Sequence, residues 1–137
     1  MLVAHAYIEV TDAERGIAFY CGGLGLRLKR RLSPRWIELD GANLPVFLLA
    51  GRSSPADLGQ GRTAPRDYRR HWTPVHLDFV VPDLDTMVSR LCGLGGSLDC
   101  DIKQRDYGRI ANMGDPFGNG FDLIEFSGAG YDGVSRG

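Results

Sequence analysis

Two segments of the chain share one pattern of apolar and polar positions. In residues 3–10 every second residue is Ala, Ile or Val, as expected for a strand with one buried face. Residues 75–81 alternate in the same way. Each segment leads to an aspartate suited to a helix N-cap, Asp12 or Asp83. Apolar residues at helical spacing follow: Ile17, Tyr20, Cys21 and Leu24 in the first segment, and Leu84, Met87, Val88 and Leu91 in the second. The pattern therefore predicts two units in which a strand opens into a capped helix.

A constant offset relates the two segments and indicates an internal duplication. His5 aligns with His76 and Cys21 with Cys92, since 76 minus 5 and 92 minus 21 both give 71. The glycines that end the two predicted helices keep the same offset. We interpret this as one duplication rather than a repeat array.

Further strands follow each predicted helix. They are expected over residues 26–32, 35–39, 44–50, 97–102, 109–113 and 121–126. A hairpin is predicted at Asp40-Gly41, and a turn at 115–120, where Pro, Gly and Asn allow the required backbone angles. Residues 1–137 are thus expected to form one α+β domain of two βαβββ modules, at 2–50 and 74–126.

The composition changes between the modules. Residues 51–72 are rich in Gly, Pro and Ser and contain five arginines against two aspartates. We predict a linker over 51–73, either a solvated connector or a basic flap over a site. Residues 127–137 are predicted to be a Gly-rich tail with little to bury.

Composition and charge narrow the class of protein. The 137 residues are 43% hydrophobic with a net charge of -1, which favours a soluble domain over one that binds nucleic acid or a membrane surface. No apolar run approaches the roughly 20 residues that span a bilayer, and no signal-peptide pattern is present. The spacing of the three cysteines fits no metal or redox motif. We expect reduced thiols in a cytoplasmic protein, with Cys21 and Cys92 as small core residues.

Candidate chemistry lies on the strand faces opposite the apolar ones. These faces carry His5 and Glu9 in the first module and His76 and Asp78 in the second, and the last strand adds Asp122. Two imidazoles and a carboxylate suit iron, manganese, nickel or zinc with positions open for a substrate. Glu9 and Asp78 are candidates for a catalytic base or for holding a ligand histidine, and solvated surface charges are the alternative.

The chain resembles the vicinal oxygen chelate superfamily, which includes glyoxalase I, extradiol dioxygenases, methylmalonyl-CoA epimerase, and fosfomycin and bleomycin resistance proteins. The resemblance covers about residues 2–126. It is carried by His5, Phe19-Tyr20, Leu24-Gly25-Leu26, His76 and Asp115-Pro116-Phe117-Gly118-Asn119. It implies paired βαβββ modules in a curved mixed sheet around a cavity, a homodimer, and metal ligands at His5, His76 and Asp122.

Two positions depart from the superfamily pattern. The last ligand is normally Glu, and Asp122 is one methylene shorter, so a metal must sit closer or be absent. Alternation places the nearby Glu125 on the opposite face. The last strands of the two modules correspond, so that Phe47 aligns with Asp122. The ligand that glyoxalase I supplies from the end of the first module falls on Phe47 or its neighbour Leu48, neither of which binds metal. Three ligands fit the dioxygenases better than a four-ligand glyoxalase I site, although dioxygenases are usually longer chains.

Two functions of different classes remain. The first is a metalloenzyme whose divalent ion chelates two neighbouring oxygens of a small-molecule substrate, in lyase, isomerase or dioxygenase chemistry. The second is a metal-free protein that binds a small molecule or an antibiotic, as bleomycin resistance proteins do. Fold alone does not choose between them. The metal content of the purified protein would separate them.

Overall fold

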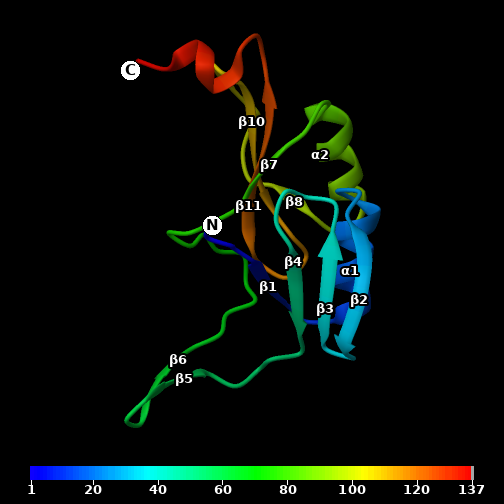
Figure 1. The fold of residues 1–137 in the computed structure, drawn as a ribbon, viewed down its shortest axis with the longest axis vertical. Coiled ribbons are helices and arrows are strands. Elements are labelled where there is room, and N and C mark those ends of the chain that lie inside the picture. Colours follow the sequence, from blue (N-terminus) through cyan, green and yellow to red (C-terminus); the bar gives the residue numbers. More distant parts are fainter. Residues whose placement is uncertain (137) are drawn as a thin grey trace. The chain divides into compact units, whose positions relative to one another are not determined.

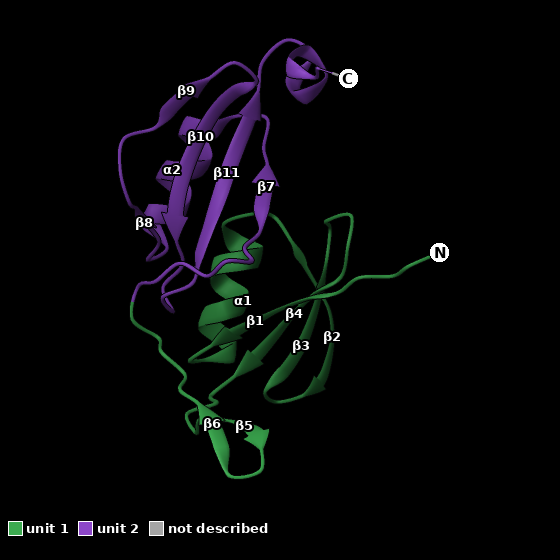
Figure 2. Cartoon of the chain, turned by 90° about the vertical axis from the view of Figure 1, so that its left-hand side faces the viewer, with its two compact units in different colours: residues 1–69 green, residues 70–137 purple. Residues whose placement is uncertain are grey.

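The computed structural model describes residues 1–136 and divides the chain into two compact units, unit 1 over residues 1–69 and unit 2 from residue 70 onward (Figure 2). Unit 1 contains β1 (Ala6–Val10), α1 (Ala13–Gly22), β2 (Arg27–Ser33), β3 (Trp36–Asp40), β4 (Val46–Ala50), β5 (Ala56–Gly59) and β6 (Arg62–Ala64). Unit 2 contains β7 (Asp78–Val80), α2 (Leu84–Gly93), β8 (Ser97–Leu98), β9 (Lys103–Arg105), β10 (Gly108–Gly114), β11 (Gly120–Phe126) and the 3-10 helix η1 (Gly130–Val134).

The two units have the same sheet topology. The strand order is β1-β4-β3-β2 in unit 1 and β7-β11-β10-β8 in unit 2, where β9 also pairs with β10. In each unit the first and last strands of the module run parallel, and the other pairs are antiparallel. Helix α1 packs on β2, β3 and β4, and α2 packs on β8, β10 and β11 (Figure 1). The predicted α+β class with two βαβββ modules is confirmed.

Each helix starts at the predicted aspartate. Asp12 accepts a hydrogen bond from the Arg15 backbone N–H at 2.8 Å, and Asp83 accepts one from Thr86 N–H at 3.1 Å. These bonds satisfy backbone donors that a helix N-terminus leaves open. Within residues 1–136, no helix has the length and apolar character that crossing a membrane requires.

The buried face of α1 differs from the predicted one. The expected stripe was Ile17, Tyr20, Cys21 and Leu24, whereas the buried residues of the helix are Gly16, Phe19 and Tyr20. A Cβ placed on Gly16 would lie 3.0 Å from Leu48 Cδ1, so a larger residue here would require the Leu48 side chain to shift. The Gly16 face of the helix lies against the sheet, and Ile17 and Cys21 are half-buried.

Both histidines lie just before their strands rather than on them. β1 begins at residue 6, directly after His5, and β7 begins two residues after His76. Val75, expected on the packed face of a longer strand, is 85% exposed. The reason is that pairing of β7 with β11 starts only at Asp78.

Other expectations were also wrong in detail. Cys92 is exposed and Cys21 half-buried, so neither is a core residue. The predicted linker 51–73 contains the β5–β6 hairpin. Of the predicted strand over 97–102, only the first two residues form a strand, β8, and β9 begins after it at Lys103. The predicted tail contains η1, whose Tyr131 packs against Phe126 with ring centres 4.7 Å apart. The last residue of that tail, 137, lies outside the described residues.

Glu125 links α2 to the sheet and lies on the opposite face from Asp122, as alternation predicted. Its Oε2 accepts a hydrogen bond from Leu84 N–H at 2.8 Å, and its Oε1 pairs with Arg109 at 3.0 Å. The bond to the Leu84 backbone, with a further contribution from Arg109, lowers the pKa of Glu125. The carboxylate thus helps to stabilise the first turn of α2.

This arrangement predicts acid-sensitive stability. A lowered folded-state pKa contributes stability that is complete above the unfolded pKa of about 4.3 and is lost as pH falls through the folded value. Between about pH 6 and about pH 3, the thermal unfolding midpoint of wild type should fall further than that of Glu125→Gln. Glu14→Gln, at an exposed acid in the first turn of α1, is the control. Parallel pH curves for wild type and Glu125→Gln would contradict the assignment.

Candidate functional site

Three side chains with metal-binding chemistry meet where β7 and β11 pair. Asp78 lies directly opposite Asp122 in this parallel ladder. His76 Nε2 is 3.2 Å from Asp78 Oδ1 and 3.2 Å from Asp122 Oδ2. One ligand atom of each residue can be chosen so that all three lie within 4.8 Å of one another. We call this group the His76 triad.

The environment of the triad separates its two carboxyl groups. The Asp122 side chain is only 9% exposed, whereas that of Asp78 is 40% exposed. Burial, the charge of Asp122 and a hydrogen bond with Asp122 raise the pKa of Asp78, and His76 partly opposes this rise. Repulsion between two close carboxylates is relieved when one of them binds a proton or when both bind a cation. The triad is therefore suited to sharing a proton or to binding a cation.

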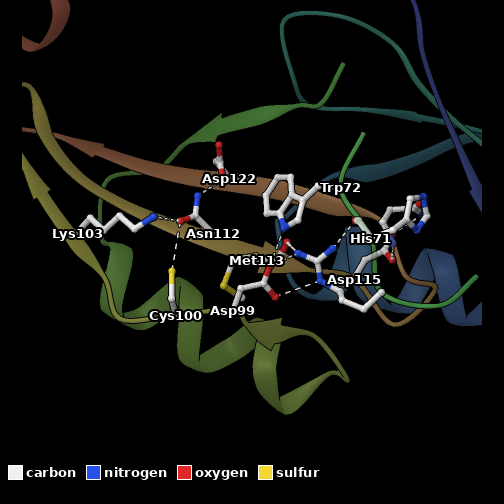
Figure 3. Close-up of polar contacts among 11 residues, drawn as sticks. His71, Trp72, Asp99, Cys100, Lys103, Asn112, Met113, Asp115 and Asp122 are labelled. Atoms are coloured by element: carbon white, nitrogen blue, oxygen red, sulfur yellow. Dashed lines mark hydrogen bonds and ion pairs between the residues drawn. The ribbon is translucent and has the colours of Figure 1, made fainter. Parts of the chain in front are cut away.

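Asn112 and Lys103 fix the orientation of Asp122 (Figure 3). Asn112 stands opposite Asp122 in the β10–β11 ladder, and its Nδ2 donates to Asp122 Oδ1 at 2.7 Å. Lys103 Nζ donates to Asn112 Oδ1 at 2.9 Å, which sets which end of the amide faces Asp122. Asp122 Oδ2 is the oxygen that lies near His76. Sequence reasoning missed both residues, although a hairpin that pairs 114 with 120 also pairs 112 with 122.

Trp72 forms a wall beside His76. The two rings meet edge to face, with centres 5.6 Å apart. Trp72 Nε1 donates to Asp99 Oδ2 at 2.8 Å (Figure 3). The Arg70 guanidinium carbon lies 4.8 Å from the centre of the Trp72 ring. Asp99 also pairs with Arg70. These contacts hold the indole in place, since its polar atom and one face both have partners.

The equivalent positions in unit 1 carry aromatic residues instead. Tyr7 pairs with Phe47 in the β1–β4 ladder, as Asp78 pairs with Asp122 in unit 2. The Tyr7 and Phe47 rings are stacked with centres 4.7 Å apart and planes at 6°. The His5 ring lies 5.1 Å from Phe47. The predicted correspondence between Phe47 and Asp122 is confirmed, and the duplicated backbone therefore presents carboxylates in unit 2 and aromatic rings in unit 1.

The predicted site residues fall in both units. His76, Asp78 and Asp122 come together in unit 2. His5 and Glu9 belong to unit 1, where Glu9 accepts from Arg66 Nε through both oxygens, at 2.6 and 3.0 Å. The metal role of His5, His76 and Asp122, and the catalytic roles of Glu9 and Asp78, stay predictions.

Comparisons with known proteins agree on a family. The model of the glyoxalase-like domain family matches residues 5–124. An anthracycline biosynthesis protein of Streptomyces peucetius, DnrV, is 31% identical over 133 residues, which cover 96% of this chain and 44% of that protein. The chain thus spans less than half the length of this curated relative.

Solved structures show the same fold. A glyoxalase-related enzyme from Fulvimarina pelagi has a TM-score of 0.72 at 20% identity, covering 95% of this chain and 94% of that one. The fosfomycin resistance protein FosX of Listeria monocytogenes has 0.68 at 19%, covering 93% and 94%. A lactoylglutathione lyase from Agrobacterium tumefaciens has 0.61 at 15%, covering 90% and 92%. The resemblance to the vicinal oxygen chelate superfamily is confirmed.

The close packing of the Trp72 ring against Gly120 predicts that a methyl group at position 120 destabilises the fold. A Cβ at position 120 would lie 2.7 Å from Trp72 ring atoms, so Gly120→Ala must displace the indole. We expect a loss of about 1–3 kcal/mol in the free energy of unfolding, measured by chemical denaturation. Gly93→Ala is the matched control, because a Cβ at the end of α2 meets nothing within 4 Å. An equal effect of the two substitutions would contradict this packing.

The close carboxylates predict a gain in stability when one of them is removed. Asp78→Asn removes a partly buried negative charge and its repulsion from Asp122, the two causes that raise the pKa of Asp78. In chelator-treated protein near neutral pH, this variant should unfold at a higher temperature than wild type. Asp132→Asn, in η1, is the control. A lower midpoint for Asp78→Asn would show that the carboxylate stabilises the fold.

Proposed function

Because the chain belongs to the glyoxalase-like domain family, we propose that it binds a divalent cation through His76 and Asp122, with Asp78 as third ligand or base, and acts on a small-molecule substrate. The observation that carries the proposal is the His76 triad. It combines one imidazole and two carboxylates in unit 2, whereas unit 1 has aromatic rings at the positions of the carboxylates.

The donor set fits a transition metal. Imidazole nitrogen and carboxylate oxygen bind zinc, iron, manganese or nickel, and bond lengths of about 2.0–2.2 Å place two ligand atoms at most about 4.4 Å apart. The chosen ligand atoms of the triad lie within 4.8 Å of one another, close to this limit, and His76 Nε2 is 3.2 Å from an oxygen of each carboxyl group. The bond from Asn112 to Asp122 supplies the outer-shell support that metal ligands require.

The chemistry of the bound cation would be charge stabilisation at neighbouring oxygens of the substrate. The residues of this chain have separate tasks. Asn112 holds Asp122 in one orientation, and Trp72 limits the space beside His76. Asp78, the more exposed carboxyl group with a raised pKa, is placed to take or return a proton. Lyase, isomerase and dioxygenase chemistry all remain compatible with these tasks.

Two further parts of the proposal come from the superfamily resemblance. The first is His5 as a further metal ligand, which the alignment of His5 with His76 in the duplication also supports. The second is a homodimer, in which each chain would present its sheet edges to the other. Glu9 is proposed only as a candidate base, because its carboxylate is already paired with Arg66.

The alternative is a metal-free protein that binds a planar aromatic molecule. It is favoured by the stacked Tyr7–Phe47 pair, of which Tyr7 is 48% exposed. The contacts of His76 with both carboxyl groups are also satisfied without a cation. The relative DnrV is named for anthracycline biosynthesis, and an anthracycline-like ring system is a suitable probe for this alternative.

Metal analysis of protein purified without chelator tests the proposal. Wild type should contain near-stoichiometric metal by plasma mass spectrometry, whereas His76→Ala and Asp122→Asn should lose it. Asn112→Ala should weaken metal affinity by roughly 10- to 100-fold, as expected for an outer-shell partner. His71→Ala, at the third histidine, is the matched control and should retain the metal. His5→Ala should lose metal if the alignment with His76 is functional.

Two results would contradict the proposal. One is wild-type protein that stays metal-free after incubation with each of the four metals. The other is metal that His76→Ala retains in full. Saturable binding of an anthracycline to metal-free wild type would then support the alternative.

A further inference from the structure

Unit 1 contains a pocket that no part of the proposed function uses. Its volume is about 590 Å³, and it lies between the β2–β3 turn and the segment that leads from β4 into β5. Three arginines line it, Arg35, Arg52 and Arg66, together with Trp36. We call it the Arg35 pocket. All of its residues belong to unit 1, whereas the His76 triad lies in unit 2, so a ligand in this pocket does not depend on the triad.

The arginines of this pocket differ in how far their charge is compensated. Arg66 is 16% exposed and is held by Glu9 through Nε and by the Ser54 carbonyl through Nη1. Arg52 is 52% exposed and lies 3.9 Å from the same Glu9 oxygen, too far for a hydrogen bond. One carboxylate therefore stands against two guanidinium groups, and Arg66 takes both of its oxygens.

Arg35 adds an uncompensated charge. No carboxylate of residues 1–136 lies within ion-pair distance of its guanidinium group. The group lies beside Gly51, where a Cβ would be 3.7 Å from Arg35 Cζ, and Gly51 N–H is bonded to the Val10 carbonyl at 3.0 Å. The acid that also lines the pocket, Asp57, already accepts a bond from Gly59 N–H at 2.8 Å. Three positive charges against Glu9 and Asp57 leave the pocket with an excess of one.

An aromatic face completes the pocket. Trp36, the first residue of β3, is 40% exposed although it is large and apolar. It pairs with Leu49 of β4, which also lines the pocket. An exposed indole next to guanidinium groups is suited to a planar ring that carries an anionic group, because the ring stacks and the charge pairs bidentately.

We infer that the Arg35 pocket binds an aromatic oxyanion, with a carboxylate or phosphate on Arg35 and Arg52 and the ring on Trp36. Arg66 is a positioning residue, since its contacts with Glu9 and Ser54 hold the linker against the sheet as one wall of the pocket. The inference gives the basic segment between the modules a binding role.

Two-dimensional NMR of the full chain tests the inference directly. The protein has two tryptophans, so the indole N–H signal lost in Trp36→Phe is that of Trp36. Phenyl phosphate and benzoate, titrated separately, distinguish phosphate from carboxylate as the preferred anion. At least one of them should shift the Trp36 signal saturably and leave that of Trp72 in place. Inorganic phosphate, which lacks the ring, should bind more weakly.

Variants separate a specific site from general attraction to a basic surface. Arg35→Ala should weaken the binding of phenyl phosphate or benzoate by about tenfold or more, the effect of one charge-assisted hydrogen bond. Arg62→Ala, an exposed arginine of β6 outside the pocket, is the matched control and should bind as wild type does. Arg35→Lys, which keeps the charge, should fall between wild type and Arg35→Ala.

Three results would overturn the inference. The first is no saturable shift of the Trp36 signal with either aromatic probe. The second is an equal loss of binding in Arg62→Ala and Arg35→Ala. The third is equal affinity for inorganic phosphate and phenyl phosphate, which would remove the ring from the assignment.

Discussion

Parallel pairing between the first and last strands of a module is the constraint on which the rest of the structure depends. This pairing places Asp78 opposite Asp122, residues 44 positions apart in sequence, and it places Tyr7 opposite Phe47 in unit 1. A parallel pair needs a long crossover connection, which the helix and the intervening antiparallel strands provide. The candidate site therefore depends on the pairing of β7 with β11. Any change that shifts the register of this pair would separate the two carboxylates.

The two units keep this backbone and differ in its chemistry. In unit 2 the histidine contacts carboxylates, which suits a cation or a shared proton. In unit 1 the histidine lies near stacked aromatic rings, which suits an apolar or planar ligand. Duplication explains this division, because one copy can retain a polar site while the other changes. The hydrogen bonds that orient Asp122 come from β10 and β9 of the same unit, so the triad has its support within unit 2.

Local patterns predicted what depends on local chemistry. The capping aspartates, the glycine helix ends and the alternating strands were recognised from the sequence because each has a short-range physical cause. The correspondence between Phe47 and Asp122 also followed, because it needs only the duplication and the turn at 115–120. His76 and Asp122 were identified as candidates in the same way.

Other features depend on tertiary contacts that no local pattern contains. Asn112 reaches Asp122, and Lys103 reaches Asn112, only through the registers of two strand pairs. The face of α1 was misjudged because a pattern of apolar residues does not include Gly16, which faces the sheet close to Leu48. Cys92 was expected in the core because free cysteines are usually buried, but its position on α2 faces solvent. The Arg-rich segment gave no sign of the β5–β6 hairpin.

We propose above all that the His76 triad is a metal centre. Anomalous diffraction at the absorption edge of the metal, in crystals grown from metal-loaded protein, tests this most directly because it locates the ion. The account predicts an anomalous peak about 2.0–2.2 Å from His76 Nε2 and from a carboxylate oxygen of Asp122. A peak bound elsewhere on the chain, with His76 Nε2 still in contact with both carboxyl groups, would contradict it.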